Sequence, residues 1–234
     1  MVAGVLVLAP ACSSSDDAGT DTVSEPTTST AVASTTTTAA SAPAPAPVAD
    51  ADEPVFASLL GFLSAFTAVG PAVTPGSEPF ALSTDSVTRG TIATGESAFV
   101  SATGIPGGII GGTLGDDDAV TAAFVFVDPA TPTAGTAVLS LVAATIASQA
   151  EFDQPAFIQS YGDVTADLAN RAGEQRWQPS TNGSGHSLVT TVVEGVEGGG
   201  NLIEVAIVPF AAEDDALAAV KPLRNAVIGL AAAD

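Results

Sequence analysis

The residues best equipped for binding chemistry lie in one short stretch of the second half of this sequence. The only tyrosine, Tyr161, the only tryptophan, Trp177, and the only histidine, His186, occur there together with Arg171 and Arg176. An arginine beside a tryptophan is a favoured composition of interaction hot spots and of anion or cation–π contacts. We therefore take these five residues as candidates for ligand or partner binding. The alternative is a strand whose Trp177 packs on the core while Arg176 faces solvent.

Catalysis by a Ser-His-Asp triad would have to use His186, because the chain has no other histidine. The preceding residues, Gly183, Ser184 and Gly185, indicate a tight turn that enters a strand, and no G-x-S-x-G nucleophile elbow occurs in the sequence. An active site would need Asp, Glu, Ser and His186 to converge from unrelated positions. We predict no catalytic residue.

Metal sites built from histidine and cysteine are excluded, because the only cysteine, Cys12, lies far from His186 in the sequence. The acidic cluster Asp116, Asp117 and Asp118 offers oxygen ligands for calcium, but the spacing of an EF-hand loop is absent. A solvated turn is the favoured interpretation of this cluster. The glycine-rich segment 104–112 carries no nucleotide-binding pattern, so we predict neither a cofactor nor a metal.

Two helix starts in the sequence resemble each other. Residues 52–56, DEPVF, match residues 153–157, DQPAF. In each, an aspartate fits the N-cap position, and a proline fits the first turn, where its missing N–H costs nothing. Both segments therefore predict the beginning of a helix.

The same element order then follows twice: a strand, a glycine-rich connection, a second strand closed by proline, and an alanine-rich helix. These elements fall at 95–100, 104–115, 120–127 and 134–149 in the first copy, and at 185–190, 195–200, 202–208 and 214–230 in the second. Residues 136–147 alternate enough to be a strand instead. Pro222 predicts a kink or a helix break after Val220.

This order predicts an α+β fold. Strands joined by short glycine-rich turns form antiparallel hairpins, on which helices pack as a second layer. We expect two pseudo-repeats of helix, strands and helix, 52–150 and 151–234, packed as one globular domain. A groove or a continuous sheet would lie between the halves, and binding pockets favour such internal interfaces.

The N-terminus begins with an apolar run over residues 2–9 that leads through Leu-Ala-Pro-Ala to Cys12. Small residues before a lone cysteine at the end of an apolar run resemble the export signal of a bacterial surface lipoprotein. The resemblance implies an export signal over 1–12, a lipid on Cys12, and a location on the outer face of the cytoplasmic membrane or on the cell surface. No Lys or Arg precedes Arg89, so the basic part of such a signal would lie upstream of Met1. The alternative is a cleaved signal peptide that leaves an unused thiol.

Residues 13–51 are rich in Thr, Ser, Ala and Pro. Such a segment buries too little apolar area to offset chain entropy, so we expect a disordered tether. The uncharged stretches 54–77 and 129–150 are long enough to span a membrane, but Gly, Pro, Ser and Thr interrupt them. We expect them to form buried helices.

The charge of the chain limits its partners. It carries 26 acidic and 5 basic residues, a formal net charge of -21. Nucleic acids and anionic lipid surfaces require basic patches, so both are excluded as partners of the domain. We predict an acidic, non-enzymatic binding or adaptor module of the cell envelope, lipid-anchored to the membrane, which holds an apolar small molecule or docks an envelope protein. An exported hydrolase with an unrecognised active site is the alternative.

Overall fold

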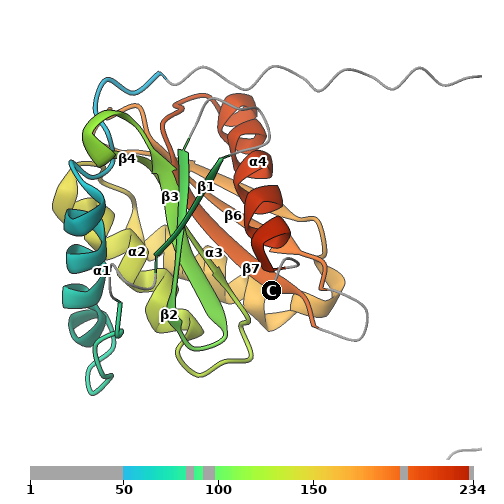
Figure 1. The fold of residues 1–234 in the computed structure, drawn as a ribbon. Helices are drawn as coiled ribbons and strands as arrows, with labels where there is room; N and C mark the ends of the chain where they lie inside the picture. The colour runs from blue at the N-terminus through green and yellow to red at the C-terminus, as the bar shows by residue number, and fades with distance from the viewer. Residues whose placement is uncertain (1–49, 83–86, 92–97, 196–199, 232–234) are drawn as a thin grey trace, which may run out of the picture. The chain divides into compact units, whose positions relative to one another are not determined.

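The computed structural model describes residues 50–82, 87–91, 98–195 and 200–231. The predicted export signal, Cys12 and the predicted tether up to residue 49 lie outside the described residues. The described residues form four α-helices and one antiparallel sheet of seven strands, which confirms the α+β fold (Figure 1).

The sheet has the strand order β1-β2-β3-β4-β7-β6-β5, and every neighbouring pair is antiparallel. Its central pair is β4 and β7, in which Val127 lies opposite Ile203. In chain order the elements are α1 (Leu59–Val73), β1 (Val87–Thr91), β2 (Ala98–Ile105), β3 (Gly108–Leu114), β4 (Val120–Val127), α2 (Ala134–Ser148), α3 (Gln154–Ala166), β5 (Gln175–Pro179), β6 (Ser187–Val193), β7 (Leu202–Val208) and α4 (Glu213–Ala231).

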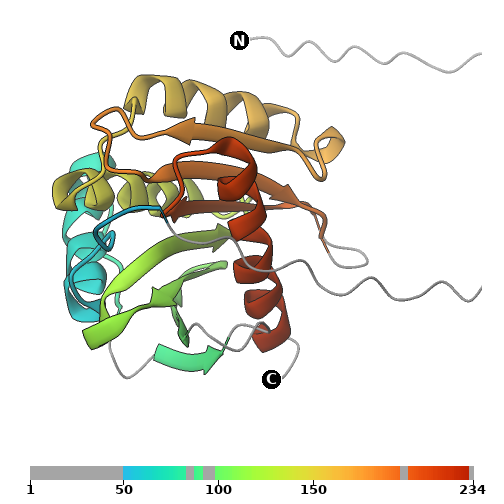
Figure 2. The same ribbon diagram turned by 90° about the horizontal axis from the view of Figure 1, so that it is seen from above.

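The helices are divided unequally between the two faces of the sheet. Helices α1, α2 and α3 share one apolar cluster with the sheet, and α4 forms a second cluster with the opposite face. Figure 2 shows α4 on one side of the sheet, away from α1 and α2. Because side chains alternate along a strand, β7 sends Ile203 and Val205 toward the three helices and Ala206 toward α4.

Helix α2 is the most deeply buried of the helices. It contains no charged residue and packs against both α1 and the sheet, so most of its side chains are buried. A helix that is apolar on all sides is stable only inside a core. The segment 136–147 is therefore helical rather than a strand. Within the described residues, no helix is both long enough and apolar enough to cross a bilayer.

The first predicted helix start was wrong. Helix α1 begins at Leu59, where the Ser58 hydroxyl accepts a hydrogen bond of 3.1 Å from the Gly61 N–H. The expected start at residues 52–56 is extended instead, because Phe56 exchanges backbone hydrogen bonds with Val120 of β4. Pairing with the sheet outweighs the local helix signal there.

The second predicted helix start is confirmed. Helix α3 begins at Gln154, with Pro155 in its first turn. The Asp153 carboxylate caps it by accepting a hydrogen bond of 3.1 Å from the Ala156 N–H.

The predicted glycine-rich connection 104–115 was also wrong, because most of it forms the inner strand β3. Only Pro106 and Gly107 make the turn between β2 and β3, and Gly107 has a φ of 66° that suits glycine. A Cβ atom on Gly112 would lie 2.4 Å from the Ala122 carbonyl oxygen. Glycine therefore allows β3 to approach β4 closely.

Of the kink or break predicted at Pro222, the break does not occur, since α4 runs continuously from Glu213 to Ala231. The pseudo-repeat is not confirmed either. A twofold axis that exchanges β4 with β7 would keep α2 and α4 on one face of the sheet, whereas they lie on opposite faces.

Candidate functional site

The structure gathers two of the five candidate binding residues on one carboxylate. The Arg171 guanidinium donates to both Glu174 oxygens at 3.1 and 2.9 Å, and Arg176 Nε donates to Glu174 Oε1 at 2.8 Å. Arg176 Nη1 also donates to the backbone oxygen and the hydroxyl of Ser160 on α3. Hydrogen bonds from Arg176 and then from Arg171 lower the pKa of Glu174. Arg176 thus ties β5 to α3, and Glu174 joins the two guanidinium groups.

Trp177 lies on the opposite face of the sheet from Arg176, because neighbouring strand residues alternate. Its indole packs against the α4 cluster and donates a hydrogen bond of 2.8 Å to the Ser187 hydroxyl. Tyr161 is half-buried on α3, where its ring stacks on Phe157 at a centroid distance of 6.0 Å. Burial raises the pKa of Tyr161. The arginines and Trp177 therefore do not form one surface patch.

His186 is fully buried at the start of β6. Its Nδ1 lies 3.2 Å from the hydroxyl of Ser184, and its Nε2 has no hydrogen-bond partner among the described residues. Burial lowers the pKa of His186. Ala51 covers the adjacent Gly185, so the imidazole sits beneath the segment that leads into the domain. A substrate would have no access to this ring.

The acidic cluster forms an exposed turn, in which Asp117 and Asp118 have positive φ angles. Asp118 accepts two hydrogen bonds from the Arg89 guanidinium of β1, at 2.9 and 3.0 Å. The hydrogen bond from Arg89 lowers the pKa of Asp118. Among the described residues, no group of three or more His, Cys, Asp or Glu side chains is placed to hold a metal.

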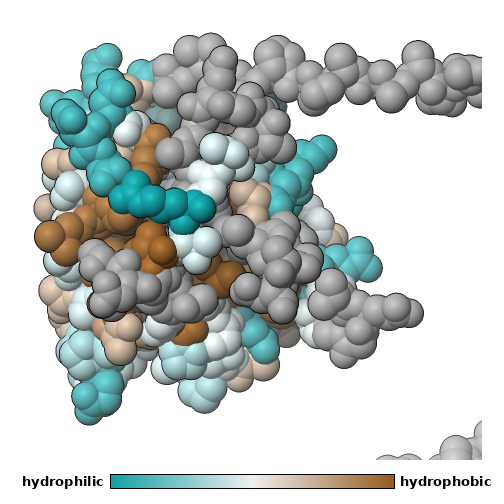
Figure 3. All heavy atoms as spheres, in the orientation of Figure 1, coloured by the Kyte–Doolittle hydropathy of each residue, from teal (hydrophilic) through white to brown (hydrophobic). Residues whose placement is uncertain are grey.

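The three-helix layer is almost free of charge, although the chain is strongly acidic. Helices α1 and α2 have no charged residue, and α3 has only Asp163. Leu60 of α1 is 63% exposed, and it borders a shallow hollow with Leu63, Thr67 and Leu82. In Figure 3, which keeps the orientation of Figure 1, hydrophobic residues gather on the side where α1 lies.

A second hollow in this layer forms a groove of about 260 Å³ between α1, α2 and α3. Beside it, Ile158 of α3 is 52% exposed. The groove is lined by Ala72, Val73, Leu139, Val142, Gln154, Phe157 and Ile158. It lies between the first half of the chain, which supplies α1 and α2, and the second half, which supplies α3.

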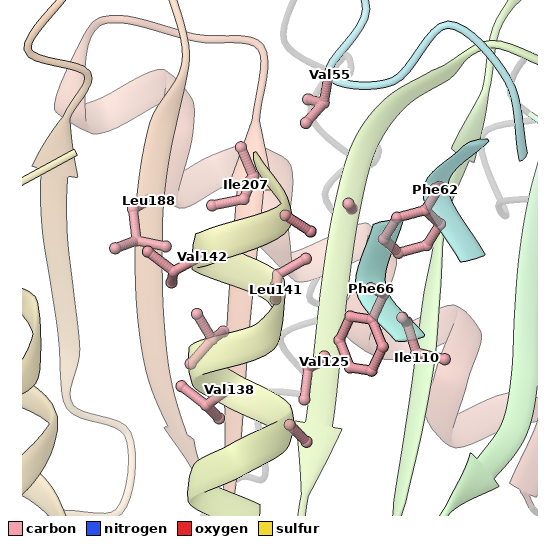
Figure 4. Packing of buried hydrophobic residues seen from close by; sticks show 14 of the residues in the cluster. Val55, Phe62, Phe66, Ile110, Val125, Val138, Leu141, Val142, Leu188 and Ile207 are labelled. Atoms are coloured by element: carbon pink, nitrogen blue, oxygen red, sulfur yellow. The ribbon is translucent and has the colours of Figure 1, made fainter. Parts of the chain in front are cut away.

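The floor of this groove is held by the core. Val142 belongs to the same helix as Val138 and Leu141, which are fully buried. Figure 4 shows these three side chains among those of the surrounding strands and of α1. The groove is therefore built on rigid, packed elements.

One buried acidic group was not singled out from the sequence. Glu204 of β7 has no exposed surface, and neither carboxylate oxygen has a hydrogen-bond partner among the described residues. Burial raises the pKa of Glu204 to about 8, and the charge of Arg224 on α4 opposes this shift. The signal was visible in principle: Glu204 is the only charged residue in the otherwise apolar run Leu-Ile-Glu-Val-Ala-Ile-Val.

Comparison with protein families, with curated proteins and with solved structures finds no match for this chain.

Proposed function

We propose that this chain is a lipid-anchored, non-enzymatic binding module of the cell envelope, and that it holds an apolar group in the groove between α1, α2 and α3. One observation carries the proposal: an uncharged groove, bordered by the half-exposed Ile158, in a molecule with a net charge of -21. Ligand sites are concave and mostly apolar, and this groove has both properties.

The lining selects the chemistry of the occupant. It offers aliphatic side chains and the ring of Phe157, and Gln154 is the polar residue at its border. The groove is small compared with ligand pockets of about 300–1,000 Å³. It suits a short apolar segment of a small molecule or one or two apolar side chains of an envelope protein. A neutral occupant also avoids repulsion by the acidic surface.

The groove is tested by the substitution Ile158→Asp. The variant is expected to bind the uncharged solvatochromic dye Nile red about tenfold more weakly, because the groove loses apolar contact area and gains a charge. Fluorescence titration of the dye measures the affinity. Ile158 is half-exposed on α3, so the fold tolerates this change.

The matched control is Leu60→Asp, which introduces the same charge at another exposed aliphatic residue of the helix layer. It is expected to leave dye affinity within about twofold of the wild-type value. An equal loss of dye affinity in both variants would mean that the dye binds the apolar surface of the helix layer in general. That result would contradict binding in the groove. If only Ile158→Asp weakens binding, native mass spectrometry of the protein purified from its own host identifies the natural occupant.

The anchor is tested by Cys12→Ser. We expect this variant to move from the membrane fraction to the soluble fraction, because the serine hydroxyl cannot replace the cysteine thiol as the site of lipid attachment. Immunoblotting of fractionated cells measures the distribution. Unchanged membrane association would refute lipid attachment at this residue, and the groove would remain open to its own test.

A further inference from the structure

Three polar side chains lie in one row across the sheet, on the face opposite the three helices. Gln175 of β5 lies directly opposite Thr191 of β6, and Thr191 lies directly opposite Glu204 of β7. Directly paired strand residues point to the same face, with their Cβ atoms about 5 Å apart. The row begins at the exposed edge of the sheet with Gln175 and ends in the core with Glu204, which has no exposed surface.

The Thr191 hydroxyl lies beside the Gln175 carboxamide. Gln175 Nε2 is 3.4 Å from Thr191 Oγ1, and the carboxamide carbon is one covalent bond beyond Nε2. Thr191 is only 1% exposed, and its hydroxyl has no hydrogen-bond acceptor among the described residues. A hydroxyl oxygen and an acyl carbon are the nucleophile and the electrophile of an acyl transfer. The two strands hold them as neighbours.

Glu204 supplies the acid–base group that such a transfer needs. Neither of its oxygens has a hydrogen-bond partner within the described part of the chain, so neither is committed to another contact. Burial raises the pKa of Glu204 to about 8, and the charge of Arg224 opposes this shift by favouring the carboxylate. A general acid–base group works best when its pKa lies near the ambient pH, because both of its protonation states are then populated. A hydrophobic residue in this position would avoid the cost of burying a carboxyl group.

We propose that the protein forms an ester bond between the side chains of Thr191 and Gln175, with Glu204 as the proton carrier. Thr191 Oγ1 attacks Gln175 Cδ, and the Glu204 carboxylate takes the hydroxyl proton. A C–O bond forms, the C–N bond of the carboxamide breaks, and Glu204 passes the proton to the departing nitrogen. The products are a side-chain ester and one molecule of ammonia, so the reaction needs no further reactant.

The fold provides conditions that favour this acyl transfer. Strand pairing holds the two reacting groups together, which gives them a high effective concentration. Gln175 is exposed, so ammonia escapes to solvent and is not available for the reverse reaction. Burial of Thr191 keeps water away from the ester oxygen. The row lies on the face opposite the groove between α1, α2 and α3, so this inference does not depend on the proposed function.

The ester secures an edge of the sheet. Strand β5 is the last strand on its side and, among the described strands, pairs with β6 alone. Unpaired edges are the places where a sheet adds strands from other chains. Because the chain has one cysteine, no disulfide within it can fasten this edge. An ester between β5 and β6 is a covalent cross-link that requires neither cysteine nor an oxidant.

Tryptic peptide mapping of the purified full-length chain tests the ester. Trypsin cleaves after Arg176 and so separates Gln175 from Thr191. We expect the two fragments to remain joined in most molecules, at a mass lower by one ammonia than the sum of the separate fragments. Two separate fragments of full mass overturn the proposal. So does a loss of ammonia confined to the fragment that contains Asn182, because an Asn-Gly sequence loses ammonia when it forms a succinimide.

Substitutions assign the reacting atoms. Thr191→Val and Gln175→Ala are expected to give separate fragments, whereas Thr191→Ser keeps the hydroxyl and gives joined ones. Gln178→Ala is the matched control, because Gln178 belongs to the same strand but its amide reaches a backbone oxygen of the α3 cap, so the fragments stay joined. Glu204→Gln cannot carry the proton, and we expect at least about tenfold less of the joined fragments. Joining at the wild-type level in Thr191→Val, Gln175→Ala or Glu204→Gln overturns the proposal.

Discussion

Between pH 4.5 and pH 8, the free energy of unfolding of the wild-type protein is expected to fall by as much as about 5 kcal/mol. The cause is Glu204, whose pKa burial raises from 4.5 to about 8. Within this window the unfolded chain has released the proton and the folded chain still holds it, so rising pH favours unfolding. Below pH 4.5 both states are protonated, and above pH 8 both are ionised.

Urea denaturation at a series of pH values measures this fall, and Glu204→Gln isolates its source. His186 contributes a slope of opposite sign, because burial lowers its pKa from 6.5 and stability is lost as pH falls through that region. The Glu204→Gln variant keeps the pH dependence that comes from His186. It is expected to lose the fall in the free energy of unfolding toward pH 8. A wild-type curve that matches the Glu204→Gln curve would contradict the role assigned to Glu204.

Phe66→Ala is expected to lower the free energy of unfolding by about 3–5 kcal/mol, the usual cost of deleting a fully buried ring. Phe66 has no exposed surface and packs on Phe62 and Phe80, with centroid distances of 6.4 and 5.4 Å. Figure 4 shows its ring directed toward the sheet, near Ile110 and Val125. Urea denaturation at constant pH measures the loss.

The matched control for this substitution is Leu60→Ala on the same helix. Leu60 is largely exposed, so its truncation is expected to change stability by less than about 1 kcal/mol. Comparable losses in the two variants would mean that α1 is not held on the sheet by its phenylalanine face.

The sequence predicts those elements of the fold whose signals are local. The capping residue Asp153 and Pro155 mark the start of α3, and the apolar runs of β4 and β7 indicate central strands. The start of α1 could not be found in this way, because Phe56 is extended only through its pairing with Val120, far along the chain. Likewise, the glycines of β3 signal a turn locally, and only the close approach to β4 explains them as strand residues.

The candidate site could be predicted from the sequence less well than the fold. Nearness in the chain suggested that Arg176 and Trp177 act together, but strand alternation places them on opposite faces of the sheet. The alternative, a strand whose Trp177 packs on the core, agrees with the contact of Trp177 with the α4 cluster. The groove depends on how three helices pack against one another, which no local pattern encodes. Glu204 was detectable as a charge within an apolar strand, although its lack of a partner required the packed structure.

The junction of β4 with β7 has a consequence for how fast the native state is reached. Val127 pairs with Ile203 roughly 80 residues later in the chain, so the sheet closes only after a long loop has been ordered. Closing such a loop costs chain entropy before the distant contacts form, so this pairing slows folding relative to strands joined in local hairpins. A nascent chain of this kind therefore exposes unpaired strand edges and apolar side chains for longer than one whose strands all pair in local hairpins, and during that time it is prone to aggregate.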